Sequence, residues 1–134
     1  MILITCVDDK MGMLFNKRRQ SMDSVLRERV LKMCAGKKLW MNEYSRKQFD
    51  AAAEGISVDD DFMAKAGEDD YCFVENISPK AYEGQFKQIV LYKWNRVYPA
   101  DLYFDIDLTD WRLAQSSDFA GSSHDKITEE IYVK

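Results

Sequence analysis

The sequence predicts an α/β domain with three layers, α-β-α, in which a mixed and mostly parallel sheet ends in antiparallel strands. Strand-like and helix-like segments alternate over the first half of the chain, a pattern typical of β-α-β units with parallel strands. After Tyr92 no segment has a useful helical period, and the remaining apolar stretches have the composition of strands. No linker, repeat or low-complexity segment divides the 134 residues, so we expect one domain over 1–134.

The N-terminal segments give the clearest signals for individual elements. Residues 2–7 are an apolar, β-branched run that favours a buried central strand. Residues 8–20 are expected to form a loop, and residues 22–34 carry apolar side chains near helical spacing. Ser21 is the expected N-cap of that helix, and Gly36 is the expected stop signal.

In the rest of the chain, predicted strands and helices alternate up to about residue 66, and only strands are predicted after that. The same criteria predict, in order, a strand at 38–41, a short helix at 44–53, a strand at 56–58, one or two helical turns at 62–66, strands at 71–75 and 88–94, and candidate strands at 101–108, 111–119 and 126–133. The last of these alternates apolar and polar residues. A sheet of this composition would begin parallel and finish antiparallel.

Composition and charge narrow the class of protein. Hydrophobic residues make up 46% of the chain and charged residues 31%, which is ordinary for a packed domain. The net charge of −4 argues against a nucleic-acid partner, which needs a concentrated basic face. Cys6, Cys34 and Cys72 lie in apolar stretches and predict buried thiols of a reducing compartment. The apolar run 2–7 is too short for a signal-peptide core or a membrane span, so we expect a cytoplasmic protein with no membrane partner.

Both ends of the chain resemble one known family. Residues 2–30 are similar to the first strand, the mobile loop and the first long helix of the dihydrofolate reductases. Residues 89–134 resemble the last strands of that family, with an acid-plus-aromatic strand, the Asp110-Trp111 step and the Ser123-His124 hairpin in the family's order. The resemblance spans nearly the whole chain and implies a dihydrofolate reductase-like fold.

The resemblance also implies an NADPH site, and this chain departs from it at three places. The family has a Gly-Arg-x-Thr-like turn after the second strand, where this chain has Asn42-Glu43-Tyr44-Ser45, and an acid there would repel phosphates. The family's Gly-Gly pair after a central strand is replaced by Glu75 and Asn76. The segment before Val58 is too short to build the family's adenosine pocket. We therefore expect no cofactor and no reductase activity.

The first loop and the first helix hold the candidate ligand site. The carboxylate that grips a pterin ring in the family falls, with a one-residue gap, on Asp23; the alternative is a helix-start acid stabilised by about 0.3–1 kcal/mol. Arg18 and Arg19 would suit a phosphate or carboxylate, or else form an exposed loop that balances nearby acids. The expected ligand is a small heterocycle or an anion, bound by Val7, Met13, Phe15, Arg18, Arg19 and Asp23.

Other chemistries have weaker support. His124 is the only histidine and stands between Ser123 and Asp125, but adjacent residues of one hairpin cannot reach opposite nitrogens of one ring. We therefore expect a turn histidine at the cleft edge and no triad. A lone histidine together with three core-like cysteines excludes the usual zinc sets. Mg²⁺ would require convergence of Asp8, Asp9, Asp105, Asp107 and Asp110.

Three functions remain open from the sequence. The leading hypothesis is a dihydrofolate reductase-like domain that binds a small ligand or a partner and has lost NADPH binding. The alternative is an enzyme, either a reductase with another cofactor or a nucleotide or RNA hydrolase, although the histidine-rich two-zinc motif of a ribonuclease-type hydrolase is absent. A third hypothesis is oligomerisation through an exposed sheet edge.

Overall fold

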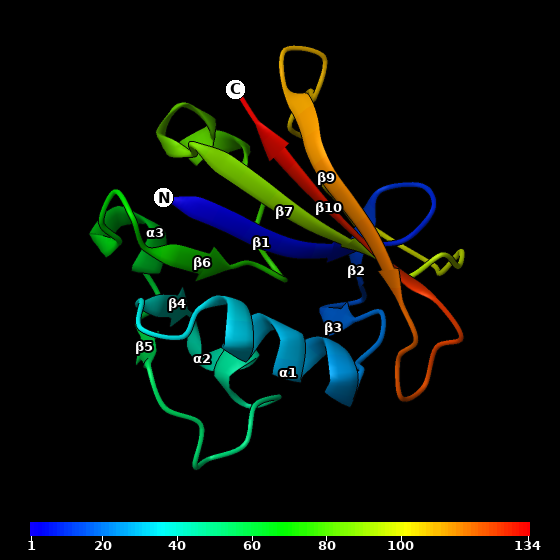
Figure 1. The fold of residues 1–134 in the computed structure, drawn as a ribbon, viewed down its shortest axis with the longest axis horizontal. Helices are drawn as coiled ribbons and strands as arrows, with labels where there is room; N and C mark the ends of the chain where they lie inside the picture. The colour runs from blue at the N-terminus through cyan, green and yellow to red at the C-terminus, as the bar shows by residue number, and fades with distance from the viewer.

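A computed structural model describes residues 1–134 and contains a large sheet, a small sheet and a few short helices (Figure 1). The strands are β1 (Ile2–Val7), β2 (Gly12–Phe15), β3 (Arg18–Arg19), β4 (Leu39–Met41), β5 (Ile56–Val58), β6 (Tyr71–Phe73), β7 (Gln88–Lys93), β8 (Leu102–Tyr103), β9 (Arg112–Phe119) and β10 (Ile127–Val133). The helices are α1 (Ser24–Met33), α2 (Glu43–Arg46), α3 (Phe62–Lys65) and the 3-10 helix η1 (Lys80–Gln85).

The large sheet has the strand order β5-β4-β6-β1-β7-β10-β9. Its first five strands pair in parallel, and β10 runs antiparallel to both β7 and β9. The predicted mixed sheet with an antiparallel end is therefore confirmed. The segment that follows β1 forms β2 and β3, which pair with β8 in a small sheet of order β3-β2-β8.

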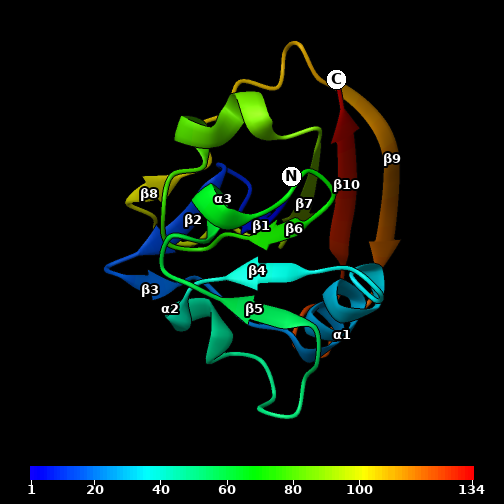
Figure 2. The ribbon, with the colours of Figure 1, turned by 90° about the vertical axis from the view of Figure 1, so that its left-hand side faces the viewer.

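The core is split into two clusters, one on each face of the large sheet. Alternation along β1 places Leu3 and Val7 in one cluster and Ile2 and Ile4 in the other. α1 covers the Ile2 face, whereas α3 and the small sheet cover the Leu3 face (Figure 2). This is the three-layer arrangement that the sequence predicted.

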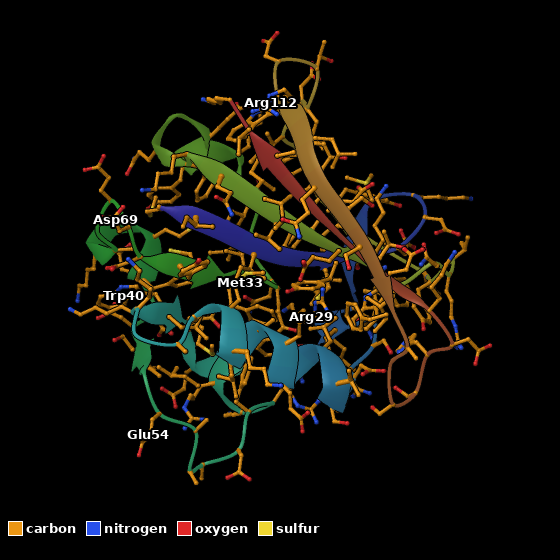
Figure 3. All side chains as sticks on the ribbon, in the orientation of Figure 1. Arg29, Met33, Trp40, Glu54, Asp69 and Arg112 are labelled. Atoms are coloured by element: carbon orange, nitrogen blue, oxygen red, sulfur yellow. The ribbon has the colours of Figure 1, made fainter.

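α1 begins two residues later than expected. Its N-cap is Asp23 and not Ser21, because the Asp23 carboxylate accepts hydrogen bonds from the N–H groups of Val25 and Leu26. Leu26 and Val30 are buried and lie one turn apart, so they form the face that meets the sheet. On the neighbouring face Arg29, labelled in Figure 3, donates to buried Glu129 of β10 at 2.8 Å.

The helix expected at 44–53 is a single turn, α2. Asn42 caps it and Phe49 is buried in the core, but the following alanines are largely exposed. A short helix needs tertiary packing to persist, and residues 51–53 have little to pack against. Propensity alone therefore overestimated the length of this helix.

The loop expected at 8–20 contains the β2–β3 hairpin. Its turn is made by Asn16 and Lys17, both with positive φ (51° and 61°), as in the tight turns that join antiparallel strands. The hairpin could not be recognised in the sequence because its turn residues include no glycine, the usual signal for such a turn. Of the strand expected at 101–108, only Leu102–Tyr103 pairs, and it joins the small sheet as β8.

None of the helices has both the length and the apolar composition of a transmembrane span.

Burial raises the pKa of the Cys34 and Cys72 thiols to about 12, so both side chains act as small apolar groups of the core.

Candidate functional site

The carboxyl ends of the parallel strands are the usual place for ligands in an open α/β sheet. Here the ends of β4 and β6 are tied together by an amide bridge. Asn42 Nδ2 donates to Asn76 Oδ1 at 2.8 Å, and Asn42 Oδ1 accepts the N–H of Ser45 at 3.0 Å. The turn after β4 therefore uses both polar atoms of the Asn42 side chain within the chain, whereas Ser45 Oγ is buried without a hydrogen-bond partner.

A second bridge crosses the same edge of the sheet. Arg19 on β3 forms a two-pronged ion pair with Glu75, with Nε–Oε2 and Nη2–Oε1 distances of 3.0 and 3.2 Å. The guanidinium also lies over the Tyr44 ring at 4.6 Å and donates to the Tyr44 carbonyl. Burial by itself would lower the pKa of Arg19, but the bond to the Glu75 carboxylate raises it. Arg19 and Glu75 therefore neutralise each other where the fold leaves room for a ligand.

Beside this bridge lies a surface cavity of about 310 Å³, which we call the hairpin hollow. It is lined by Phe15, Asn16, Arg18, Arg19, Gln20, Tyr98 and Pro99. Arg18 is exposed and forms no salt bridge, so its charge is available to a ligand. Gln20 donates to Asp8 and to the carbonyl of Pro99, while its Oε1 is buried without a hydrogen-bond partner. The hollow is therefore lined by one cation that has no partner in the chain.

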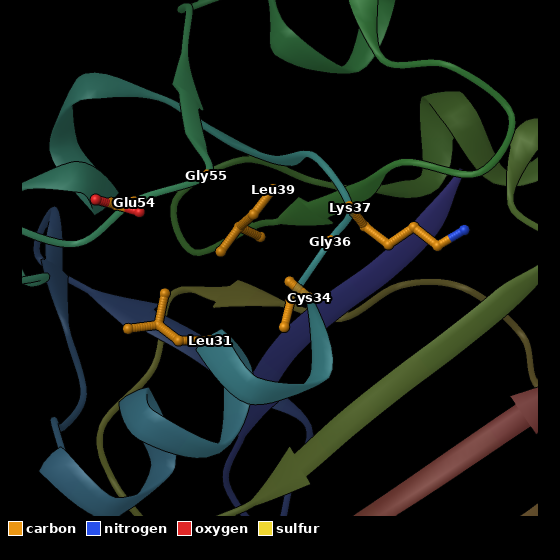
Figure 4. A pocket seen from close by; sticks show the side chains of 8 residues that line it. Leu31, Cys34, Gly36, Lys37, Leu39, Glu54 and Gly55 are labelled. Atoms are coloured by element: carbon orange, nitrogen blue, oxygen red, sulfur yellow. The ribbon is translucent and has the colours of Figure 1, made fainter.

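A larger cavity of about 400 Å³ lies at the opposite end of the sheet (Figure 4). Leu31, Cys34 and Leu39 face one another there, and Lys37 extends away from them. Since Leu39 begins β4 and Gly55 precedes β5, this cavity lies at the amino ends of the parallel strands. Its position makes it a weaker candidate than the hairpin hollow, despite its size.

The start of α1 meets the loop between β9 and β10, and Figure 1 shows the two side by side. We call this contact, made by Asp23, Ser122, Ser123 and His124, the α1 junction. The carboxylate of Asp23 accepts six hydrogen bonds: from the N–H groups of Val25, Leu26, Ser122 and Ser123, from Ser123 Oγ and from His124 Nδ1. Asp23 is 2% exposed. The expected carboxylate at the cleft mouth is instead a buried acceptor with no free lone pair.

These bonds fix the ionisation of Asp23. Burial alone would raise its pKa, but the hydrogen bonds from Ser123, Ser122, His124 and Leu26 hold it well below the usual value. Gly121 lies so close that a Cβ there would meet Asp23 Oδ2 at 2.3 Å. The sequence Gly121-Ser122-Ser123 therefore suits a loop that wraps tightly around one carboxylate.

His124 is buried and not at a cleft edge, which corrects the sequence-based expectation. Its ring stacks on Trp94 with centroids 4.6 Å apart. Nδ1 meets Asp23 Oδ2 at 3.0 Å, and Nε2 meets Ser21 Oγ at 3.1 Å and Tyr98 Oη at 3.2 Å. The prediction that residues 122–125 form no triad concerned only neighbours in the hairpin, whereas the partners of His124 come from distant parts of the chain. The only sequence signals for these partners were the single histidine of the chain and the position of Asp23 at the start of a predicted helix.

The candidate residues are not all in one place. Phe15, Arg18 and Arg19 line the hairpin hollow. Val7 and Met13 are 0% and 4% exposed and belong to the core beneath the small sheet. Asp23 lies in the α1 junction.

The acids considered for Mg²⁺ do not converge. No group of three or more His, Cys, Asp or Glu side chains is arranged to hold a metal ion. Asp8 accepts hydrogen bonds from nearby Lys10, Gly12 and Gln20 and from the N–H of Tyr98, which follows β7. Asp107 accepts from Thr109. Metal-assisted hydrolysis by this set therefore has no structural basis.

No family model and no curated protein matches this sequence. Among solved structures, dihydrofolate reductase from Enterococcus faecalis, complexed with NADP(H) and RAB-propyl, superimposes with a TM-score of 0.69. The match covers 98% of this chain and 94% of that one, at 11% sequence identity. The chain has the dihydrofolate reductase fold. This bears out the resemblance seen in the sequence, and it concerns the fold alone.

Proposed function

We propose that this chain is a dihydrofolate reductase-like domain that has lost NADPH binding and binds a small anionic heterocycle in the hairpin hollow. The main support for the loss of cofactor binding is the ion pair between Arg19 and Glu75, which places two opposite charges in contact at the carboxyl ends of the strands. A dinucleotide would have to break this pair and leave the Glu75 side chain, which is 9% exposed, unpaired.

The residues at the other cofactor positions do not fit a dinucleotide either. The Asn42–Asn76 bridge already uses the side-chain amide of Asn42 and the Oδ1 atom of Asn76. α2 has only four residues, and Glu43 in its first turn adds a negative charge where phosphates would have to approach. These observations support a loss of cofactor binding and give no role to NADPH in this chain.

The ligand class follows from the walls of the hairpin hollow. Arg18 would bind a carboxylate or phosphate. Phe15 and Tyr98 offer aromatic faces to a flat ring. A flat heterocycle that carries an acidic group meets both requirements.

Calorimetric titration tests the proposal, with folate as an acidic heterocyclic probe and NADPH as the cofactor probe. We expect no NADPH binding up to millimolar concentration, and folate binding that Arg18→Ala weakens about tenfold. Lys17→Ala is the matched control, because Lys17 is an exposed neighbouring cation outside the wall of the hollow. Micromolar NADPH binding with reduction of dihydrofolate would overturn the loss of cofactor function. Equal folate affinity in both variants would overturn the site.

A further inference from the structure

The environment of His124 has the connectivity of a nucleophile, a base and an orienting acid. A serine hydroxyl meets one ring nitrogen at 3.1 Å, and a carboxylate meets the other at 3.0 Å. These residues are Ser21, His124 and Asp23, the last two far apart in the chain. Such geometry, and not sequence order, defines an activated serine.

The hydrogen bonds assign the tautomer of His124. Asp23 is held ionised by its N–H partners, so Nδ1, which faces its carboxylate, carries the ring proton. Nε2 then presents its lone pair and accepts a proton from a hydroxyl group. Stacking on Trp94 holds the ring plane in place. The base is therefore oriented on both of its nitrogens.

Two hydroxyl groups compete for Nε2. Ser21 lies in the partly exposed segment between β3 and α1, and Tyr98 lines the hairpin hollow. Since both oxygens lie within about 3.2 Å of the same nitrogen, Ser21 Oγ is close to a wall of the hollow. A small acyl group could reach Ser21 from that side.

We propose that Ser21 is a reactive nucleophile that accepts acyl groups from small activated carboxylic esters, with His124 as its base and Asp23 as a positioning residue. Ser21 Oγ bonds to the carbonyl carbon as its proton passes to Nε2. The ester C–O bond then breaks, and the proton returns to the departing alcohol. The products are an acylated Ser21 and one alcohol, so the step needs no further reactant.

The same geometry argues against rapid turnover. The N–H groups at the start of α1, those of Ser24, Val25 and Leu26, all donate to acceptors within the chain. They are not available to stabilise an oxyanion, and loss of such a donor costs about 100- to 1,000-fold in rate. We therefore expect acylation of Ser21 and slow release of the acyl group. This reactivity does not depend on the ligand proposed for the hollow.

The test is labelling of the intact chain with an alkyl fluorophosphonate, followed by peptide mass spectrometry. We expect one label per chain on Ser21, and a burst of about one p-nitrophenol per chain with p-nitrophenyl acetate. Ser21→Ala should abolish both signals, whereas Ser116→Ala, which changes an exposed serine of β9, should keep them. An unlabelled wild type, or labelling that persists in Ser21→Ala, overturns the proposal.

Two further variants separate reactivity from folding. Asp23→Asn keeps a good N-cap but no longer stabilises the protonated ring, so we expect about 100-fold slower labelling in a chain that circular dichroism shows to be folded. Tyr98→Phe removes the competing hydroxyl, so its labelling should be faster than that of the wild type. Wild-type labelling rates in folded Asp23→Asn, or slower labelling in Tyr98→Phe, would show that the contacts only hold the loop in place.

Discussion

The α1 junction and the hairpin hollow lie near each other but treat their polar groups in opposite ways. In the junction, one buried carboxylate accepts six hydrogen bonds, and a Cβ at Gly121 would clash with it. In the hollow, Arg18 is unpaired and a buried amide oxygen of Gln20 has no partner. Saturated polar groups hold a structure together, whereas an exposed and unpaired charge such as that of Arg18 is available for a ligand.

Arg19 lies between these extremes. It lines the hollow, yet its guanidinium is committed to Glu75 and Tyr44. The neighbouring arginines thus have different roles despite their adjacent positions: Arg19 closes the cofactor edge of the sheet, and Arg18 is free to contact a ligand. Three measurements test this contrast.

The largest effect is expected from Asp23→Ala. This change removes the helix cap and leaves the buried N–H groups of the loop and His124 Nδ1 without an acceptor. We expect a loss of about 3–5 kcal/mol in the free energy of unfolding, measured by urea denaturation. Asp125→Ala, an exposed acid of the same loop, is the control and should change stability by less than about 0.5 kcal/mol. Similar losses in both variants would contradict the view that the junction is specific.

Acid should weaken the same contact to a smaller extent, because a protonated Asp23 still accepts some of its hydrogen bonds. The folded-state pKa of Asp23 lies below its unfolded value, so its stabilisation is complete above about pH 4 and is lost as pH falls toward the folded pKa. Other carboxylates titrate in this range, and the comparison with Asp23→Asn removes their contribution. We expect the stability difference between wild type and Asp23→Asn to shrink between pH 5 and pH 2. A stability difference that stays constant with pH would contradict the stabilising role of the ionised Asp23 carboxylate.

The smallest effects separate the two arginines. Arg19→Ala leaves the mostly buried Glu75 carboxylate without its ion-pair partner, and we expect a loss of about 1–3 kcal/mol in the free energy of unfolding. Arg18→Ala removes an exposed side chain without an ion pair, and its thermal unfolding should stay within about 0.5 kcal/mol of wild type. If Arg18→Ala is the more destabilising of the two, the proposed division of roles is wrong.

The elements that local pattern controls could be predicted from the sequence. Apolar runs identified β1, β6 and β7, and apolar spacing located α1. The acids Glu43 and Glu75, which replace residues of the cofactor-binding turns in the dihydrofolate reductases, were visible in the sequence. The β2–β3 hairpin was not, because positive φ at Asn16 and Lys17 is imposed by strand pairing and not by glycine.

The sequence by itself determined the mixed α/β sheet and its resemblance to dihydrofolate reductases, because hydrophobic periodicity and element order act over short stretches of chain. Only the tertiary structure decided what its polar residues do. Strand order brings the β9–β10 loop to the start of α1, and so pairs Asp23 with His124 across 101 positions of sequence. Arg19 meets Glu75 in the same way. Such pairings depend on how distant elements pack, and residue spacing along the chain carries no record of them.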